Sequence, residues 1–95
     1  MAIQTLPFDA AEVLDTPEAA AEYLKAAFET GDPAFIQDSL GVVARARGMT
    51  QLARETGLSR QALYRALSRE GGAELATIVK VMAALGLRLD PVPAE

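Results

Sequence analysis

The chain has 95 residues and a formal net charge of −4, and 51% of its residues are hydrophobic although only 5% are aromatic. This length supports one small domain with little core to spare, and such a domain often gains stability from a partner subunit. There is no cysteine and no histidine, which excludes disulfides and thiolate metal sites and removes the commonest general base. No apolar run approaches the roughly 18 residues of a membrane span, and the N-terminus lacks a basic-then-apolar leader, so we expect a cytoplasmic protein.

Charge is distributed unevenly along the chain. Residues 1–40 contain eight acidic residues and one lysine, whereas residues 41–70 contain six arginines and two glutamates. A basic middle beside an acidic front suggests two partners of opposite charge. The alternative is that the acidic residues only form the solvated surface of a helix.

Two helices are predicted in the first half of the chain, after a short turn from Asp9 to Leu14. Thr16-Pro17-Glu18 combines a hydroxyl cap, a proline and an acid, and it predicts a helix that runs to about Thr30. Asp32-Pro33 repeats this signal for a second helix, which ends at about Arg47 before Gly48. The apolar stripe of the first helix has helical spacing: Ala20, Tyr23, Leu24, Ala27 and Phe28.

Three shorter helices are predicted in the second half. Thr50 is expected to cap a helix that ends at Thr56, and Ser59 is expected to cap the next, over about residues 60–68. Gly57 supplies the turn between them. A last helix over about residues 73–85 presents a stripe of large apolar side chains: Leu75, Ile78, Val79, Met82 and Leu85. The predicted fold class is an all-α bundle of about five helices, with residues 87–89 as a candidate short strand that pairs across a dimer.

The segment from residue 49 to residue 69 predicts DNA binding. On a helical wheel, Leu63, Ala66 and Leu67 fall on one face of the fourth helix, which we expect to point inward. The opposite face forms one polar stripe of Arg60, Gln61, Tyr64, Arg65 and Ser68. Two short helices around a glycine turn, with an arginine-bearing face on the second, are typical of a helix-turn-helix whose second helix enters the major groove.

Each polar side chain suits a different part of DNA. Near the start of the fourth helix, Arg60 can donate hydrogen bonds to the edge of a guanine and Gln61 can pair with the edge of an adenine. Tyr64 can contact a thymine methyl group or a phosphate. Thr50 and Gln51, at the start of the third helix, suit phosphates. Arg65 and Arg69 suit phosphates as well, and Arg45 and Arg47 are further candidates. The predicted DNA-binding residues are Thr50, Gln51, Ser59, Arg60, Gln61, Tyr64, Arg65 and Arg69.

Several short segments between residues 7 and 89 form a specific combination: Pro7-Phe8-Asp9-Ala10-Ala11-Glu12, Gly31-Asp32-Pro33, Leu40-Gly41, Ala44-Arg45-Ala46-Arg47-Gly48-Met49-Thr50, Leu58-Ser59-Arg60, Leu63-Tyr64-Arg65-Ala66-Leu67-Ser68 and Ala84-Leu85-Gly86-Leu87-Arg88-Leu89. With them, the chain resembles lambda-repressor-type helix-turn-helix regulators and, more closely, the HigA-like addiction-module antidotes. Gly71-Gly72-Ala73-Glu74 departs from the Asn-Pro-Ser/Thr cap usual in that family. A missing cap costs the last helix on the order of 1 kcal/mol.

The resemblance implies an antitoxin of a type II toxin–antitoxin pair. Such a protein binds a RelE/HigB-like toxin and, as a homodimer on double-stranded operator DNA, represses its own operon, without cofactor or metal. Residues 1–31 would then form an N-terminal arm and acidic helix, residues 32–89 the DNA-binding part and residues 90–95 a tail. Four apolar side chains are candidate toxin contacts, although Tyr23 and Phe28 fit the domain core as well: Phe8, Leu14, Tyr23 and Phe28.

Three other functions are weighed. A stand-alone prophage-type repressor would share every DNA-binding feature and differ only in the use of residues 1–31. An enzyme is not expected, because the only carboxylate pair, Glu18 and Glu22, lies on a predicted solvated helix without a nucleophile nearby. A protein–protein adaptor would lack the salt-dependent DNA affinity that an arginine cluster confers. The operator sequence, the toxin and the dimer interface are not specified by the sequence.

Overall fold

The computed structural model of the chain describes residue 14, residues 16–68 and residues 72–94. These residues form five α-helices and no strand, which confirms the predicted all-α fold class. The helices are α2 (Pro17–Glu29), α3 (Pro33–Arg47), α4 (Met49–Thr56), α5 (Arg60–Ala66) and α6 (Leu75–Ala84). None of these helices is long and apolar enough to cross a membrane.

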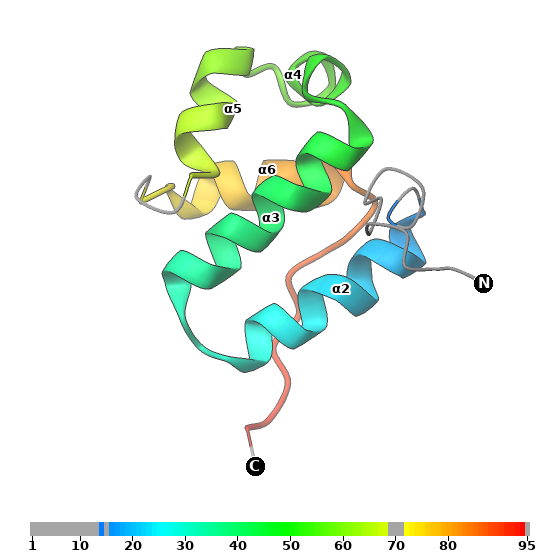
Figure 1. Cartoon of the computed structure of the whole chain (residues 1–95), viewed down its shortest axis with the longest axis vertical. Helices are drawn as coiled ribbons and strands as arrows, with labels where there is room; N and C mark the ends of the chain where they lie inside the picture. The colour runs from blue at the N-terminus through cyan, green and yellow to red at the C-terminus, as the bar shows by residue number, and fades with distance from the viewer. Residues whose placement is uncertain (1–13, 15, 69–71, 95) are drawn as a thin grey trace, which may run out of the picture.

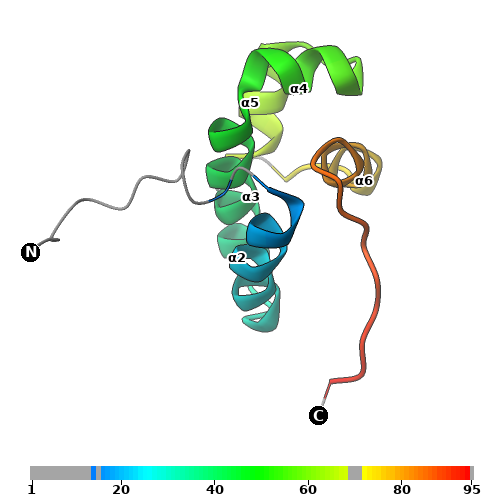
Figure 2. The ribbon, with the colours of Figure 1, turned by 90° about the vertical axis from the view of Figure 1, so that its right-hand side faces the viewer.

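The helices are arranged around α3. α2 lies alongside α3, while α4 and α5 form one end of the molecule (Figure 1). α6 and the C-terminal segment that follows it lie on another side of α3, and they form a separate layer in the perpendicular view (Figure 2). The α4–α5 end is therefore distant from the last residues of the C-terminal segment, which runs away from it (Figure 1).

The first two helices begin at the predicted signals. Thr16 Oγ1 accepts a hydrogen bond from the backbone N–H of Ala19 at 3.1 Å, and Asp32 Oδ1 accepts one from Ala34 N–H at 3.1 Å. A proline stands at the first position of each helix, where its missing N–H would have no partner. Local chemistry alone therefore locates both starts.

The short turns around α4 differ in part from the prediction. Gly48, with φ of 115°, ends α3 and begins α4, and no side chain caps α4. The predicted cap role of Thr50 is therefore wrong, because this residue already lies inside the helix. Gly57 adopts the left-handed conformation, with φ of 78°, that the turn into α5 requires. Ser59 Oγ then accepts a hydrogen bond from Ala62 N–H at 2.9 Å, which confirms the predicted cap of α5.

The last helix begins two residues later than expected, at Leu75, and no side chain caps its start. Its buried face also differs from the predicted stripe. Val81 is fully buried beside Met82, whereas Leu75 is 70% exposed and Val79 is 48% exposed. Because α6 has a single charged residue, Lys80, the pattern of hydrophobic positions does not specify which side packs inward.

Residues 87–89 do not form the candidate strand. They belong to a segment without regular structure that runs past α2 within residues 85–94 (Figure 1). A strand needs a neighbouring strand to accept its backbone hydrogen bonds, and no other described segment of this copy is extended beside this one. Pairing of these residues across a dimer stays a prediction. Leu87 N–H bonds back to the carbonyl of Met82 at 2.8 Å, and the Leu87 side chain packs on the core.

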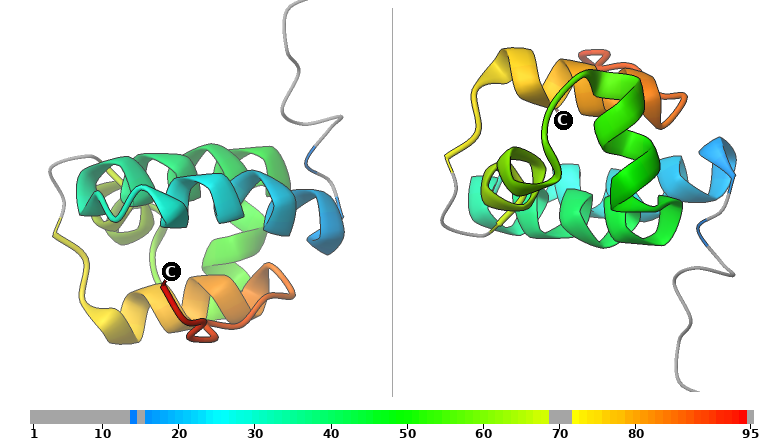
Figure 3. Two further views of the ribbon diagram at one scale, coloured as in Figure 1. Left: turned by 90° about the horizontal axis from the view of Figure 1, so that it is seen from below. Right: turned by 90° about the horizontal axis from the view of Figure 1, so that it is seen from above.

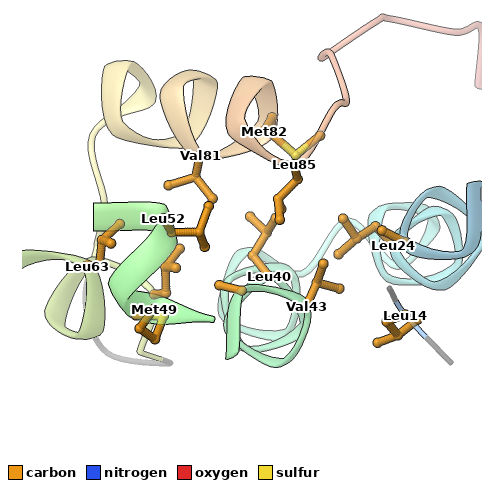
Figure 4. Packing of buried hydrophobic residues seen from close by; sticks show 13 residues of the cluster. Leu14, Leu24, Leu40, Val43, Met49, Leu52, Leu63, Val81, Met82 and Leu85 are labelled. Carbon is orange, nitrogen blue, oxygen red and sulfur yellow. The ribbon is translucent and has the colours of Figure 1, made fainter. Parts of the chain in front are cut away.

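The core joins all five helices. Its largest fully buried side chains come from α3 to α6 and the residue that follows α6: Leu40, Val43, Leu52, Leu63, Val81 and Leu85. They pack against one another between the helices, and Leu24 of α2 and the preceding Leu14 extend the cluster (Figure 4). α2 therefore contributes to the same core as the helices of the predicted DNA-binding part.

One polar contact and one close approach fix α3 against the end of α5. Gln37 Nε2 donates hydrogen bonds to the carbonyls of Ala66 at 2.9 Å and Ser68 at 3.3 Å. These carbonyls lie at a helix end, where intrahelical partners are missing. A Cβ atom at Gly41 would lie 2.8 Å from the carbonyl oxygen of Leu67, so the backbones approach closely only because this residue is glycine.

Candidate nucleic-acid interface

α4 and α5 are joined by the turn at Gly57 and lie at one end of the molecule, which faces the viewer in the right panel of Figure 3. Leu52 of α4 and Leu63 of α5 are completely buried, and Leu67 is 2% exposed. Leu58 packs against this cluster from the turn. The apolar face of α5 therefore points inward as predicted, and packing fixes the orientation of its other face.

The outer face of α5 carries the predicted polar stripe. Arg60, Gln61, Tyr64 and Arg65 are all exposed, and Tyr64 retains 44% of its accessible surface. Ser68 is half-buried, and its hydroxyl donates to the carbonyl of Arg65 at 3.0 Å. Four side chains of one short helix are therefore free to meet a large ligand together.

Arg60 and Tyr64 interact on this surface. The Arg60 guanidinium lies 5.7 Å from the centre of the Tyr64 ring, and Arg60 Nη2 donates a long hydrogen bond of 3.5 Å to the Tyr64 hydroxyl. A guanidinium this close to an aromatic face gains a cation–π attraction of about 0.5–1 kcal/mol when exposed. The pair therefore restricts the Arg60 side chain without burying its hydrogen-bond donors.

The start of α4 offers further polar groups. Thr50 and Gln51 are exposed in its first turn, and Gln51 Nε2 donates to Glu55 Oε2 at 3.1 Å. Arg54, which the sequence-based site did not include, is also exposed on α4, four residues after Thr50. This helical spacing is the signal that identifies it, since residues i and i+4 share a helix face.

The three other arginines that were candidates for DNA contacts differ in their surroundings. Arg45 is exposed on α3. Arg47 is instead engaged inside the protein, where Nη1 donates to the carbonyl of Ala84 at 2.9 Å and Nη2 donates to that of Leu85 at 3.3 Å. The end of α6 thus engages two of the five N–H donors of this guanidinium. Arg69 lies outside the described residues.

The four candidate toxin contacts are not equivalent. Leu14 is only 3% exposed and belongs to the core, so its side chain is not presented at the surface. Tyr23 is partly buried against the same core, whereas Phe28 on α2 retains 36% of its accessible surface. Phe35 on α3 is exposed to a similar extent, at 39%. Phe8 lies outside the described residues.

Comparison with known proteins gives two matches that cover nearly all of the chain. Residues 4–93 match the protein family described as probable addiction module antidote protein. A protein of Haemophilus influenzae strain Rd, described as uncharacterized, is 43% identical over 88 residues, which is 93% of this chain and 91% of that protein. No solved structure matches the chain.

Proposed function

Because the chain belongs to the family of probable addiction module antidote proteins, we propose that it neutralises a RelE/HigB-like toxin and represses its own operon as an operator-bound dimer. Members of this family are antitoxins, so the partner is a toxin and the chain is a regulator rather than an enzyme. The class of toxin, the DNA ligand and the dimeric state are the parts that we propose.

The exposed stripe of α5 is the observation that supports DNA binding most strongly. It combines two guanidinium groups, an amide and a phenol on the outer face of the second helix of a helix-turn-helix unit. Guanidinium groups pair with guanine edges and amides with adenine edges in the major groove. In this proposal Arg60 and Gln61 contact bases, Tyr64 and Ser59 assist them, and Arg65 contacts phosphate.

Phosphate contacts flank this stripe in the proposed complex. Thr50 and Gln51 lie at the start of α4, where backbone N–H groups are not capped by a side chain and favour an anion. Arg54 adds a positive charge on the exposed surface of α4, and Arg69, which lies outside the described residues, stays a predicted phosphate contact. Two copies of the chain would read the two half-sites of a symmetric operator, since a two-fold dimer matches a palindromic duplex.

Acidic side chains support the toxin partner. Glu18, Glu22 and Glu29 are exposed on α2, and toxins that bind RNA need a basic surface to hold its phosphates. Opposite charges on two partners speed their association and exclude like-charged competitors. The proposal therefore assigns toxin binding to the α2 side and DNA binding to α4 and α5.

A growth-rescue assay tests the antitoxin half of this proposal. The small open reading frame beside this chain's gene would be expressed alone and together with the chain. Growth arrest that the chain relieves supports the proposal. Absence of toxicity would favour the second candidate, a stand-alone repressor that uses the same α5 surface without a toxin.

The structure determines which variant belongs in that assay. Deletion of residues 1–31 would remove α2 and with it the buried side chains of Ala20, Leu24 and Ala27, so loss of rescue would only report unfolding. Glu18→Lys combined with Glu22→Lys alters exposed charge without touching the core. Rescue that falls with this pair, while the melting temperature stays unchanged, supports a toxin contact on α2.

A further inference from the structure

A hollow lies on the described surface between α2 and the C-terminal segment, and it has a volume of about 950 Å³. One wall comes from the later part of α2, with Leu24 and Phe28, and the other from residues 87–94. Met82 of α6 also lines it. We call this hollow the α2–tail groove, and we propose that it is the site where the toxin docks, through a basic segment that inserts apolar side chains. This inference rests on the proposed antitoxin function and locates its partner surface.

The groove is apolar and exposed at the same time. Phe28 is 36% exposed, Leu89 38% and Val92 79%, and all three line it. Large apolar side chains gathered along one groove are costly to leave in water, and such patches mark protein-binding sites. Burial of an aromatic anchor in the centre of a contact supplies the largest share of binding energy in most interfaces.

The charges beside the groove select a basic occupant. Glu18, Glu22 and Glu29 fall within about 40° of one another on a helix that turns about 100° per residue, so they form one stripe along α2. Glu29 itself lines the groove, next to Lys25, which is the one base on this helix. On the opposite wall, Arg88 and Asp90 lie 3.5 Å apart and offset each other. The net field at the α2 rim is therefore negative.

The same charges argue against two other occupants. A second copy of this chain would bring its own glutamate stripe to the contact, and like charges that face each other across an interface lower affinity. DNA is excluded by repulsion of its phosphates. The later part of α2 and residues 87–94, which line the groove, lie away from α5 in Figure 1, so a toxin in the groove leaves the proposed recognition helix uncovered.

Two matched pairs of substitutions test the inference. Leu89→Ser with Val92→Ser removes a leucine and a valine from the groove. Leu75→Ser with Val79→Ser removes the same residue types from α6, where their exposed fractions of 70% and 48% are comparable. The probe is the purified small protein encoded beside this chain's gene, titrated by calorimetry. Because none of these side chains is buried, circular dichroism should show both variants folded.

We expect the groove pair to weaken binding of that protein by at least about 30-fold, the loss typical of central interface residues, and Phe28→Ala added to this pair to weaken it further. The α6 pair should bind within about threefold of the original chain, and both variants should retain operator affinity. Equal binding by all variants would refute the α2–tail groove as the docking site, while the proposed antitoxin function would stand. Loss of self-association in the groove variant, with toxin affinity unchanged, would assign the groove to a second copy. If the original chain does not bind the probe, both the proposed antitoxin function and the assignment of the groove as a docking site are wrong.

Discussion

Replacement of Arg47 by alanine distinguishes an internal role for this side chain from a phosphate contact. Its guanidinium donates two hydrogen bonds, at 2.9 and 3.3 Å, to the carbonyls of Ala84 and Leu85. A hydrogen bond from a charged donor contributes about 1.5–3 kcal/mol. Both bonds are only partly buried, and water can replace part of what is lost, so we expect Arg47→Ala to lower the free energy of unfolding by about 2–4 kcal/mol. For a domain of this size the melting temperature should fall by about 10–25 °C.

Thermal unfolding followed by circular dichroism, at one fixed protein concentration, measures this change. Arg45→Ala is the matched control, because this exposed arginine lies on the same helix and its loss should change stability by no more than about 0.5 kcal/mol. Arg47→Lys should fall between the two, since one ammonium group cannot reproduce the planar arrangement of two donors. If Arg47→Ala melts at the same temperature as the original chain and instead weakens DNA binding, the internal role is wrong.

Three further substitutions test packing and caps, each by urea unfolding. Gly41→Ala should destabilise the chain by about 1–3 kcal/mol, because its Cβ would lie 2.8 Å from the Leu67 carbonyl oxygen; unchanged stability would show that α3 and α5 can separate freely. Leu63→Ala should cost about 2–5 kcal/mol through the cavity it leaves in the core, and a loss below 1 kcal/mol would contradict full burial. Ser59→Ala should cost about 0.5–2 kcal/mol, because the Ala62 N–H loses its acceptor, whereas Ser59→Asp should retain stability.

The sequence predicted the elements whose causes are local. Thr16 and Asp32, each followed by proline, determine where α2 and α3 begin, and Ser59 does the same for α5. These signals work because the cap and the N–H that it satisfies lie within three residues of each other. The amphipathic face of α5 was equally predictable, since Leu63 and its neighbours follow the helical period.

Features that depend on tertiary packing were not predictable in this way. The sequence cannot show that Val81 rather than Val79 is buried, because α6 is apolar on most of its surface and its neighbours decide which face packs inward. Arg47 belongs to an arginine-rich segment, and only the position of the end of α6 shows that two of its donors already bind inside the protein. The strand predicted at 87–89 had the right alternation but no partner strand within the described residues.

In the candidate site, too, features with local causes were predictable and features that depend on tertiary packing were not. The exposure of Arg60 and Gln61 followed from the wheel alone, whereas the stacking of Arg60 on the Tyr64 ring required side-chain positions. Leu14 was a reasonable surface candidate until its 3% exposure placed it in the core. The α2–tail groove was not predicted at all, because residues that line it are about 60 positions apart in the chain.

The claim that α5 reads operator DNA is tested most directly by one binding measurement. A labelled duplex from the region upstream of this chain's gene would be titrated with the original chain, Arg60→Ala and Arg88→Ala at several salt concentrations. Arg88 is an 85% exposed arginine outside α4 and α5. Its replacement by alanine makes the same change in net charge as Arg60→Ala. We predict that Arg60→Ala loses about 5- to 150-fold in affinity and discriminates less against a scrambled duplex, while Arg88→Ala binds like the original chain. Equal affinities for all three proteins, or an affinity that does not fall with salt, would contradict the assignment of α5 as the recognition helix.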